Sequence, residues 1–200
     1  MKFAFIGTHG VGKTTLAYGL AMRLKQLGAN VGFLEEVARR CPFPINEDTS
    51  LEAQTWILME TMRREIELTQ VYPDLVCDRS ALDNYCYLEF RFGRHAPLFG
   101  LVEHWASTYD LLFKVPIKAE FLHTDGTRST DLAFQRGIDA TLNGLLEETG
   151  IPWILFTSLE DAVERARLVS GRLPLAQPGF LTGGVASGCH GLLEHSVWPC

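Results

Sequence analysis

The 200-residue sequence has no apolar stretch long enough to cross a membrane, and its N-terminus shows no signal-peptide pattern. It has no C-x-x-C pair, and its five cysteines are an odd number, so neither a disulfide framework nor a zinc site is indicated. A basic excess is also missing, because 18 Lys and Arg face 24 Asp and Glu, and the net charge of −6 argues against a strongly basic nucleic-acid footprint. No internal repeat occurs. These absences predict a cytoplasmic protein with reduced thiols.

Strand and helix patterns alternate along most of the chain. Apolar runs predict strands at residues 2–6, 30–34, 75–77, 110–115 and 152–156. Helical periodicity and caps predict helices at 13–27, from a capping box at Thr49 to 70, at 82–92, at 131–148 and at 158–169. Strands separated by helices predict an α/β fold, a five-stranded parallel sheet with helices on both faces. In such sheets ligands bind at the carboxyl ends of the strands.

Residues 7–14 read GTHGVGKT, a full match to the phosphate-binding loop pattern G-x-x-x-x-G-K-S/T. The glycines allow a backbone that wraps closely around a phosphate, and the loop N–H groups and the following helix favour an anion. Lys13 can reach the β- and γ-phosphates, and the Thr14 hydroxyl can bind Mg²⁺. The nucleotide-binding candidates are Gly7, Thr8, His9, Gly10, Val11, Gly12, Lys13, Thr14 and Thr15.

A second group of polar residues follows the strand at 75–77. Asp78 is placed to hold Mg²⁺, directly or through water. Arg79 can contact phosphate oxygens with two hydrogen bonds. The alternative is a strand-end Asp that only caps the next turn. The aromatic helix at 84–92 that follows either packs into the core or stacks on a nucleobase.

Glu35 and Glu36 end the strand at 30–34, on the same sheet edge as the phosphate loop. A carboxylate there can accept a proton from a substrate hydroxyl as a general base, and Glu36 is preferred over Glu35. Arg39 lies close enough along the chain to share a face with either. A surface ion pair of little energetic value is the alternative.

The segment at 117–130 is polar and lies between a strand and a helix, which is typical of a mobile lid. Arg128 is the first candidate to neutralise charge on the γ-phosphate, and Arg136 is the second. A solvated turn is the alternative. Residues 1–170 are predicted to form one domain, and the Gly- and Pro-rich residues 171–200 a loose tail.

Five segments occur in a characteristic order along the chain: GTHGVGKTT, EEVAR, CDRSALDNYCY, YDLLFKVP and DGTRSTD. This ordered set resembles the P-loop nucleoside and nucleotide kinases. The resemblance is nearest to the nicotinamide riboside kinase domain of NadR-type proteins and related AAA-type ATPases. The resemblance covers about residues 1–168. It implies a nucleoside-monophosphate-kinase-like fold that uses ATP and Mg²⁺. It also implies an acceptor site around Glu36, Arg39, Arg79 and Asp83, with Arg128 and Arg136 over the phosphates.

The sequence therefore predicts a phosphotransferase that moves the γ-phosphoryl of ATP to a hydroxyl of a nucleoside- or nucleotide-like acceptor. Lys13, Glu36, Asp78, Arg79 and Arg128 are the predicted catalytic residues, with Thr14 and Asp78 at the metal. Two alternatives stay open: an NTPase switch that acts on a protein partner, and a kinase of a hydroxymethylated base in DNA. A homodimer is also left open.

Overall fold

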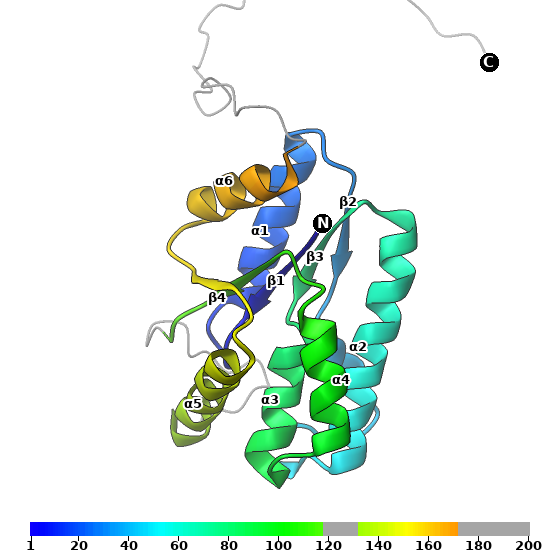
Figure 1. Ribbon diagram of the computed structural model, residues 1–200, viewed down its shortest axis with the longest axis vertical. Coiled ribbons are helices and arrows are strands. Elements are labelled where there is room, and N and C mark those ends of the chain that lie inside the picture. Colours follow the sequence, from blue (N-terminus) through cyan, green and yellow to red (C-terminus); the bar gives the residue numbers. More distant parts are fainter. Residues whose placement is uncertain (118–131, 172–200) are drawn as a thin grey trace, which may run out of the picture.

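The computed structural model describes residues 1–117 and 132–171, and within them five parallel strands form one sheet (Figure 1). The strands are β1 (Lys2–Ile6), β2 (Val31–Leu34), β3 (Asp74–Asp78), β4 (Leu111–Lys114) and β5 (Trp153–Leu155). Their order across the sheet is β2-β3-β1-β4-β5. All five predicted strands are confirmed, with ends that differ by a residue at most.

Helices cover both faces of this sheet, as predicted. The side chains of β1 alternate between the faces: Phe3 and Phe5 join one apolar cluster, and Ala4 and Ile6 join the other. The first face is covered by α1 (Lys13–Gln26) and α6 (Leu159–Ser170). The second is covered by α2 (Leu51–Val71), α3 (Ala81–Phe92), α4 (Ala96–Ala106) and α5 (Leu132–Thr149).

Three details of the helices differ from the sequence prediction. The cap of α2 is Ser50, whose hydroxyl accepts a hydrogen bond from the backbone N–H of Ala53 at 3.1 Å, and not Thr49. Helix α4 was not predicted, because it begins without a side-chain cap and carries a proline in its first turn. Two short 3₁₀ helices, η1 (Val37–Arg40) and η2 (Asn46–Asp48), were not predicted either. All three lie beside the candidate site or its helices.

Several predictions fall on residues outside the described ranges. They are the lid at 117–130 (apart from Ile117), Arg128 in it, and the tail at 171–200 (apart from Gly171), so these stay predictions. Among the described cysteines, Cys77 and Cys86 are buried free thiols and Cys41 is a partly exposed one. In the part of the chain that the structure describes, no helix is both long and apolar enough to span a membrane.

Candidate active site

The phosphate loop joins the end of β1 to the start of α1, which is the strand–loop–helix setting that the motif predicts. Gly7, Gly10 and Gly12 have φ angles of 138°, 73° and 87°, which L side chains rarely adopt. A Cβ atom on Gly7 would also lie 2.8 Å from the carbonyl oxygen of Val115. Other residues would be strained at these φ angles, and a side chain on Gly7 would collide with Val115. The loop conformation therefore requires glycine at these positions.

Lys13 lies in the first turn of α1 with its side chain folded over the loop. Its Nζ donates hydrogen bonds to the carbonyl oxygens of Gly7 at 2.7 Å and Thr8 at 2.6 Å. Burial lowers the pKa of Lys13 to about 8, helped by the charge of Arg79 and opposed by the nearby carboxylates. A buried ammonium ion held only by carbonyl oxygens and neighbouring carboxylates has much to gain from an incoming phosphate.

Thr14 and Asp78 meet beside the loop, although they are 64 residues apart. The Thr14 hydroxyl donates to Asp78 Oδ2 at 2.6 Å. Asp78 Oδ1 is buried and has no hydrogen-bond partner among the described residues. Burial raises the pKa of Asp78, although the bond from Thr14 and the charge of Lys13 oppose this effect. A hydroxyl and a carboxylate with an unsatisfied oxygen are the hard oxygen ligands that fit Mg²⁺.

Arg79 and Glu36 come together because β2 and β3 are neighbours in register. Leu34, the last residue of β2, pairs with Cys77 of β3, so the two strands end side by side and the segments that follow them bring Glu36 and Arg79 together. Arg79 Nε donates to Glu36 Oε1 at 2.7 Å. Arg39 Nε donates to the other carboxylate oxygen of Glu36 at 2.9 Å. Arg79 has a φ of 90°, an uncommon value for a residue with a side chain, and such strain is often found at functional sites.

Asp83 binds both the Arg79 guanidinium and the backbone of the phosphate loop. It is fully buried in the first turn of α3, where its Oδ2 accepts from Arg79 Nη1 at 2.7 Å. Its Oδ1 accepts from the backbone N–H of Gly7 at 3.0 Å. Asp83 does not line the acceptor pocket described below, and its predicted substrate contact stays a prediction.

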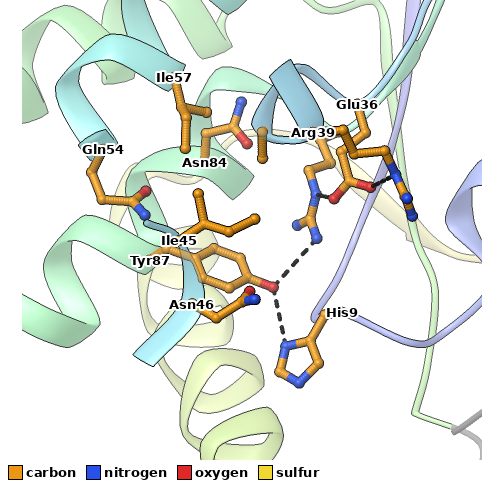
Figure 2. A pocket seen from close by; sticks show the side chains of 11 residues that line it. His9, Glu36, Arg39, Ile45, Asn46, Gln54, Ile57, Asn84 and Tyr87 are labelled. Atoms are coloured by element: carbon orange, nitrogen blue, oxygen red, sulfur yellow. Dashed lines mark hydrogen bonds and ion pairs between the residues drawn. The ribbon is translucent and has the colours of Figure 1, made fainter. Parts of the chain in front are cut away.

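A partly open pocket lies next to this ion-pair cluster (Figure 2). Glu36, Arg39 and Arg79 form one side of it. The rest comes from the phosphate loop, the segment before α2, and helices α2 and α3: His9, Ala38, Ile45, Asn46, Gln54, Ile57, Asn84 and Tyr87. We call it the acceptor pocket.

Sequence reasoning missed several of these pocket residues. Gln54 and Asn84 are polar but only 4 % and 5 % exposed, and each lies on the buried face of its helix. The sequence signal that could have identified them is a polar residue at a position where the helical pattern expects an apolar one. In the aromatic helix at 84–92, Tyr85 and Tyr87 both belong to the apolar core, and Tyr87 also lines the pocket, so stacking on a nucleobase stays a prediction. Tyr87 OH also lies 3.4 Å from His9 Nδ1.

The remaining sequence candidates lie away from the ion-pair cluster. Glu35 is exposed and pairs with Arg40 at 3.3 Å, so the structure places Glu36 and not Glu35 at the pocket. Thr15 is exposed on α1. Arg136 is exposed on α5, where it makes no ion pair within residues 1–117 and 132–171. Its predicted phosphate contact stays a prediction.

The ion pairs of Glu36 should give the folding stability a distinctive pH dependence. Burial alone would raise the pKa of Glu36, but the charges of Arg79 and Lys13 and the Arg79 hydrogen bond lower it from 4.5 to about 2. Ionised Glu36 therefore stabilises the fold above about pH 4.5, and this stabilisation is lost as the pH falls toward 2. The difference between the two pKa values corresponds to at most about 3 kcal/mol.

We expect Glu36→Gln to destabilise the protein most above about pH 5 and progressively less toward about pH 3. Urea unfolding of both proteins across this range measures the effect. Glu35→Gln is the matched control, because its carboxylate is exposed and lies outside the Arg79 cluster. A Glu36→Gln defect that stays constant with pH would contradict the stabilising ion pair.

Two solved structures share this fold. Thymidylate kinase from Ehrlichia chaffeensis is 18% identical, with a TM-score of 0.62, and the match covers 83% of this chain and 97% of that one. Deoxyadenosine kinase from M. mycoides, solved with bound dATP, is 17% identical with a TM-score of 0.54, covering 86% and 99%. At these identities the likeness concerns the fold, and it confirms the predicted P-loop kinase-like architecture. A search of curated proteins found no match.

The family is shown by a separate comparison. Residues 2–165, which contain the phosphate loop and all five strands, match the family model described as an AAA domain. With the phosphate loop and its strand–loop–helix setting already in place, this match agrees with the AAA-type resemblance found in the sequence. The chain belongs to the AAA domain family of P-loop proteins.

Proposed function

We propose that the protein is an ATP-dependent kinase that transfers the γ-phosphoryl group of ATP to a hydroxyl of a nucleoside- or nucleotide-like acceptor. One observation carries this proposal. The phosphate loop lines a small hollow together with Asp78, Glu36 and Arg79, and the acceptor pocket shares Glu36 and Arg79 with it. An acceptor hydroxyl in one space and a γ-phosphate in the other would therefore meet at these two side chains.

The phosphate hollow supplies the ATP side of the reaction. Lys13 and the loop N–H groups would hold the β- and γ-phosphates in place of the carbonyl oxygens that Lys13 now contacts. Thr14 and Asp78 would hold Mg²⁺, which neutralises phosphate charge when it is bound. The unsatisfied Asp78 Oδ1 supports this assignment.

Glu36 would orient the acceptor hydroxyl by accepting its hydrogen bond. Each carboxylate oxygen has two lone pairs, so Glu36 can accept this bond while it stays paired with Arg79. Its low pKa keeps it ionised at neutral pH, ready to take the proton late in a loose transition state. Arg79 would stabilise the charge that develops between the two pockets.

The names of the two similar structures support an acceptor of the nucleoside or nucleotide type. An NTPase switch and a kinase of modified bases in DNA are the competing functions. The cytoplasmic location, the homodimer and the closing role of Arg128 stay predictions.

The test is ATP turnover by the purified full-length chain with Mg²⁺, with and without pools of nucleosides, nucleotides and DNA. We expect ADP formation to depend on an acceptor, with a phosphorylated product seen by mass spectrometry. ATP hydrolysis at the same rate without any acceptor, and no phosphorylated product, would replace the kinase by an NTPase switch.

A further inference from the structure

Among the residues that the structure describes, the charges around the two pockets are balanced. Three basic and three acidic described side chains meet there: Lys13, Arg39, Arg79, Glu36, Asp78 and Asp83. Arg79 is held between two carboxylates, and Arg39 shares one of them at 2.9 Å. Lys13 is needed for the phosphates of ATP. Among the described residues around the acceptor pocket, no cation lacks a carboxylate partner.

A phosphate group on the acceptor would therefore enter at a high electrostatic cost. It would have to displace Glu36 or Asp83 from Arg79, or approach these carboxylates closely. Asp83 cannot move without also releasing the Gly7 N–H of the phosphate loop. Like charges placed together in a desolvated site are strongly unfavourable. The charge pattern thus favours an acceptor without a phosphate.

The polar groups of α2 and α3 indicate what the pocket binds instead. Asn84 Nδ2 donates to Thr61 Oγ1 at 2.9 Å, and the Thr61 hydroxyl is itself committed to the Ile57 carbonyl oxygen at 2.8 Å. Thr61 can therefore only accept from Asn84, which fixes which way the carboxamide points. Figure 2 shows the Asn84 carboxamide oxygen directed toward the middle of the pocket.

Gln54 also pairs with a threonine, in another part of the pocket. Its Nε2 donates to Thr49 Oγ1 at 2.8 Å. Within residues 1–117 and 132–171, no donor pairs with the carboxamide oxygen of Gln54 or of Asn84. Both residues line the pocket, so these oxygens can accept N–H or O–H groups of a ligand, and they would repel phosphate oxygens.

We infer that the acceptor is a phosphate-free nucleoside that donates an N–H or O–H hydrogen bond to Asn84. This inference rests on the proposed kinase function and narrows its substrate class. Tyr87, on the pocket wall, offers an aromatic surface for the base. The reacting hydroxyl would then lie at the Glu36 end of the pocket, next to the phosphate hollow.

The first test compares nucleosides with their own 5′-monophosphates and with DNA that carries hydroxymethyluracil, using the purified chain, ATP and Mg²⁺. We expect kcat/KM for the best nucleoside to exceed that for its monophosphate by about 10²-fold or more, because of the like-charge contact. Equal or better use of the monophosphate or the DNA would overturn the inference and leave the kinase function standing. The absence of any phosphorylated product would instead contradict the kinase function.

The second test concerns Asn84. Thr61→Val removes the oxygen that orients Asn84, and Thr69→Val is the matched control. Thr69 lies on the same helix and also donates to a backbone carbonyl, but it does not contact the pocket. We expect Thr61→Val to raise KM for the nucleoside about tenfold and to leave KM for ATP unchanged.

Asn84→Leu, which removes the oxygen itself, gives a second measurement if Thr61→Val folds poorly. Thermal unfolding identifies the variants that fold. An acceptor KM in Asn84→Leu that matches that of Thr69→Val would remove Asn84 from the specificity of the site.

Discussion

Replacing Lys13 by alanine should lower the rate of ATP turnover by about 10²-fold or more, the effect of losing one charge stabiliser in a desolvated site. Lys13 is 5 % exposed, and its ammonium group is the cation nearest the loop carbonyl oxygens of Gly7 and Thr8. Alanine is a strong helix former, so α1 should form as before. Steady-state kinetics with saturating ATP and acceptor measure the loss.

Lys25→Ala is the control for this experiment, because Lys25 is an exposed lysine in the last turn of the same helix. It removes an equal charge far from the phosphate loop along α1, and should change the rate little. Circular dichroism and thermal unfolding show whether Lys13→Ala keeps its fold. Wild-type turnover by a folded Lys13→Ala protein would remove Lys13 from the chemistry.

The sequence predicted the parts of this site that depend on local pattern. The phosphate loop follows from residue types at fixed spacing, and Asp78, Arg79 and Glu36 follow from the rule that strand ends hold ligands. The strand order places β2 beside β3, so two strand ends found separately in the sequence lie side by side. Their register ends at Leu34 and Cys77, and just beyond it Glu36 and Arg79 form an ion pair. Strand order and register are properties of the tertiary structure, so the sequence alone could not decide whether Glu35 or Glu36 faces the site.

The acceptor pocket could not be predicted in the same way. Its walls come from helices α2 and α3 and from the segment before α2, whose contacts depend on packing across the second face of the sheet. Gln54 and Asn84 belong to ordinary amphipathic helices, and only their threonine partners reveal that their carboxamides are oriented. Asp83 shows the same limit, because its bond to Gly7 joins residues that are 76 positions apart.

Glu36→Gln should lower phosphoryl transfer to the acceptor by about 10²- to 10⁴-fold, the range for losing a group that takes a proton in the transition state. Glutamine keeps the shape of the side chain and removes its charge. It also has only one carbonyl oxygen, whereas Glu36 accepts from Arg79 through one oxygen and from Arg39 through the other. ATP affinity should change only a few-fold, since Lys13 and the loop hold the phosphates.

Arg39→Gln separates the two roles of Glu36. It removes the exposed partner of the carboxylate and leaves the shorter Arg79 pair in place. If Glu36 acts on the acceptor hydroxyl, Arg39→Gln should be mild and Glu36→Gln severe. Equal losses in both variants would indicate that Glu36 serves mainly to hold the arginines.

Titration calorimetry compares the ATP affinity of Glu36→Gln with that of the unmodified protein. A loss of ATP binding in Glu36→Gln as large as the loss of transfer would assign Glu36 to the phosphate hollow, which it also lines.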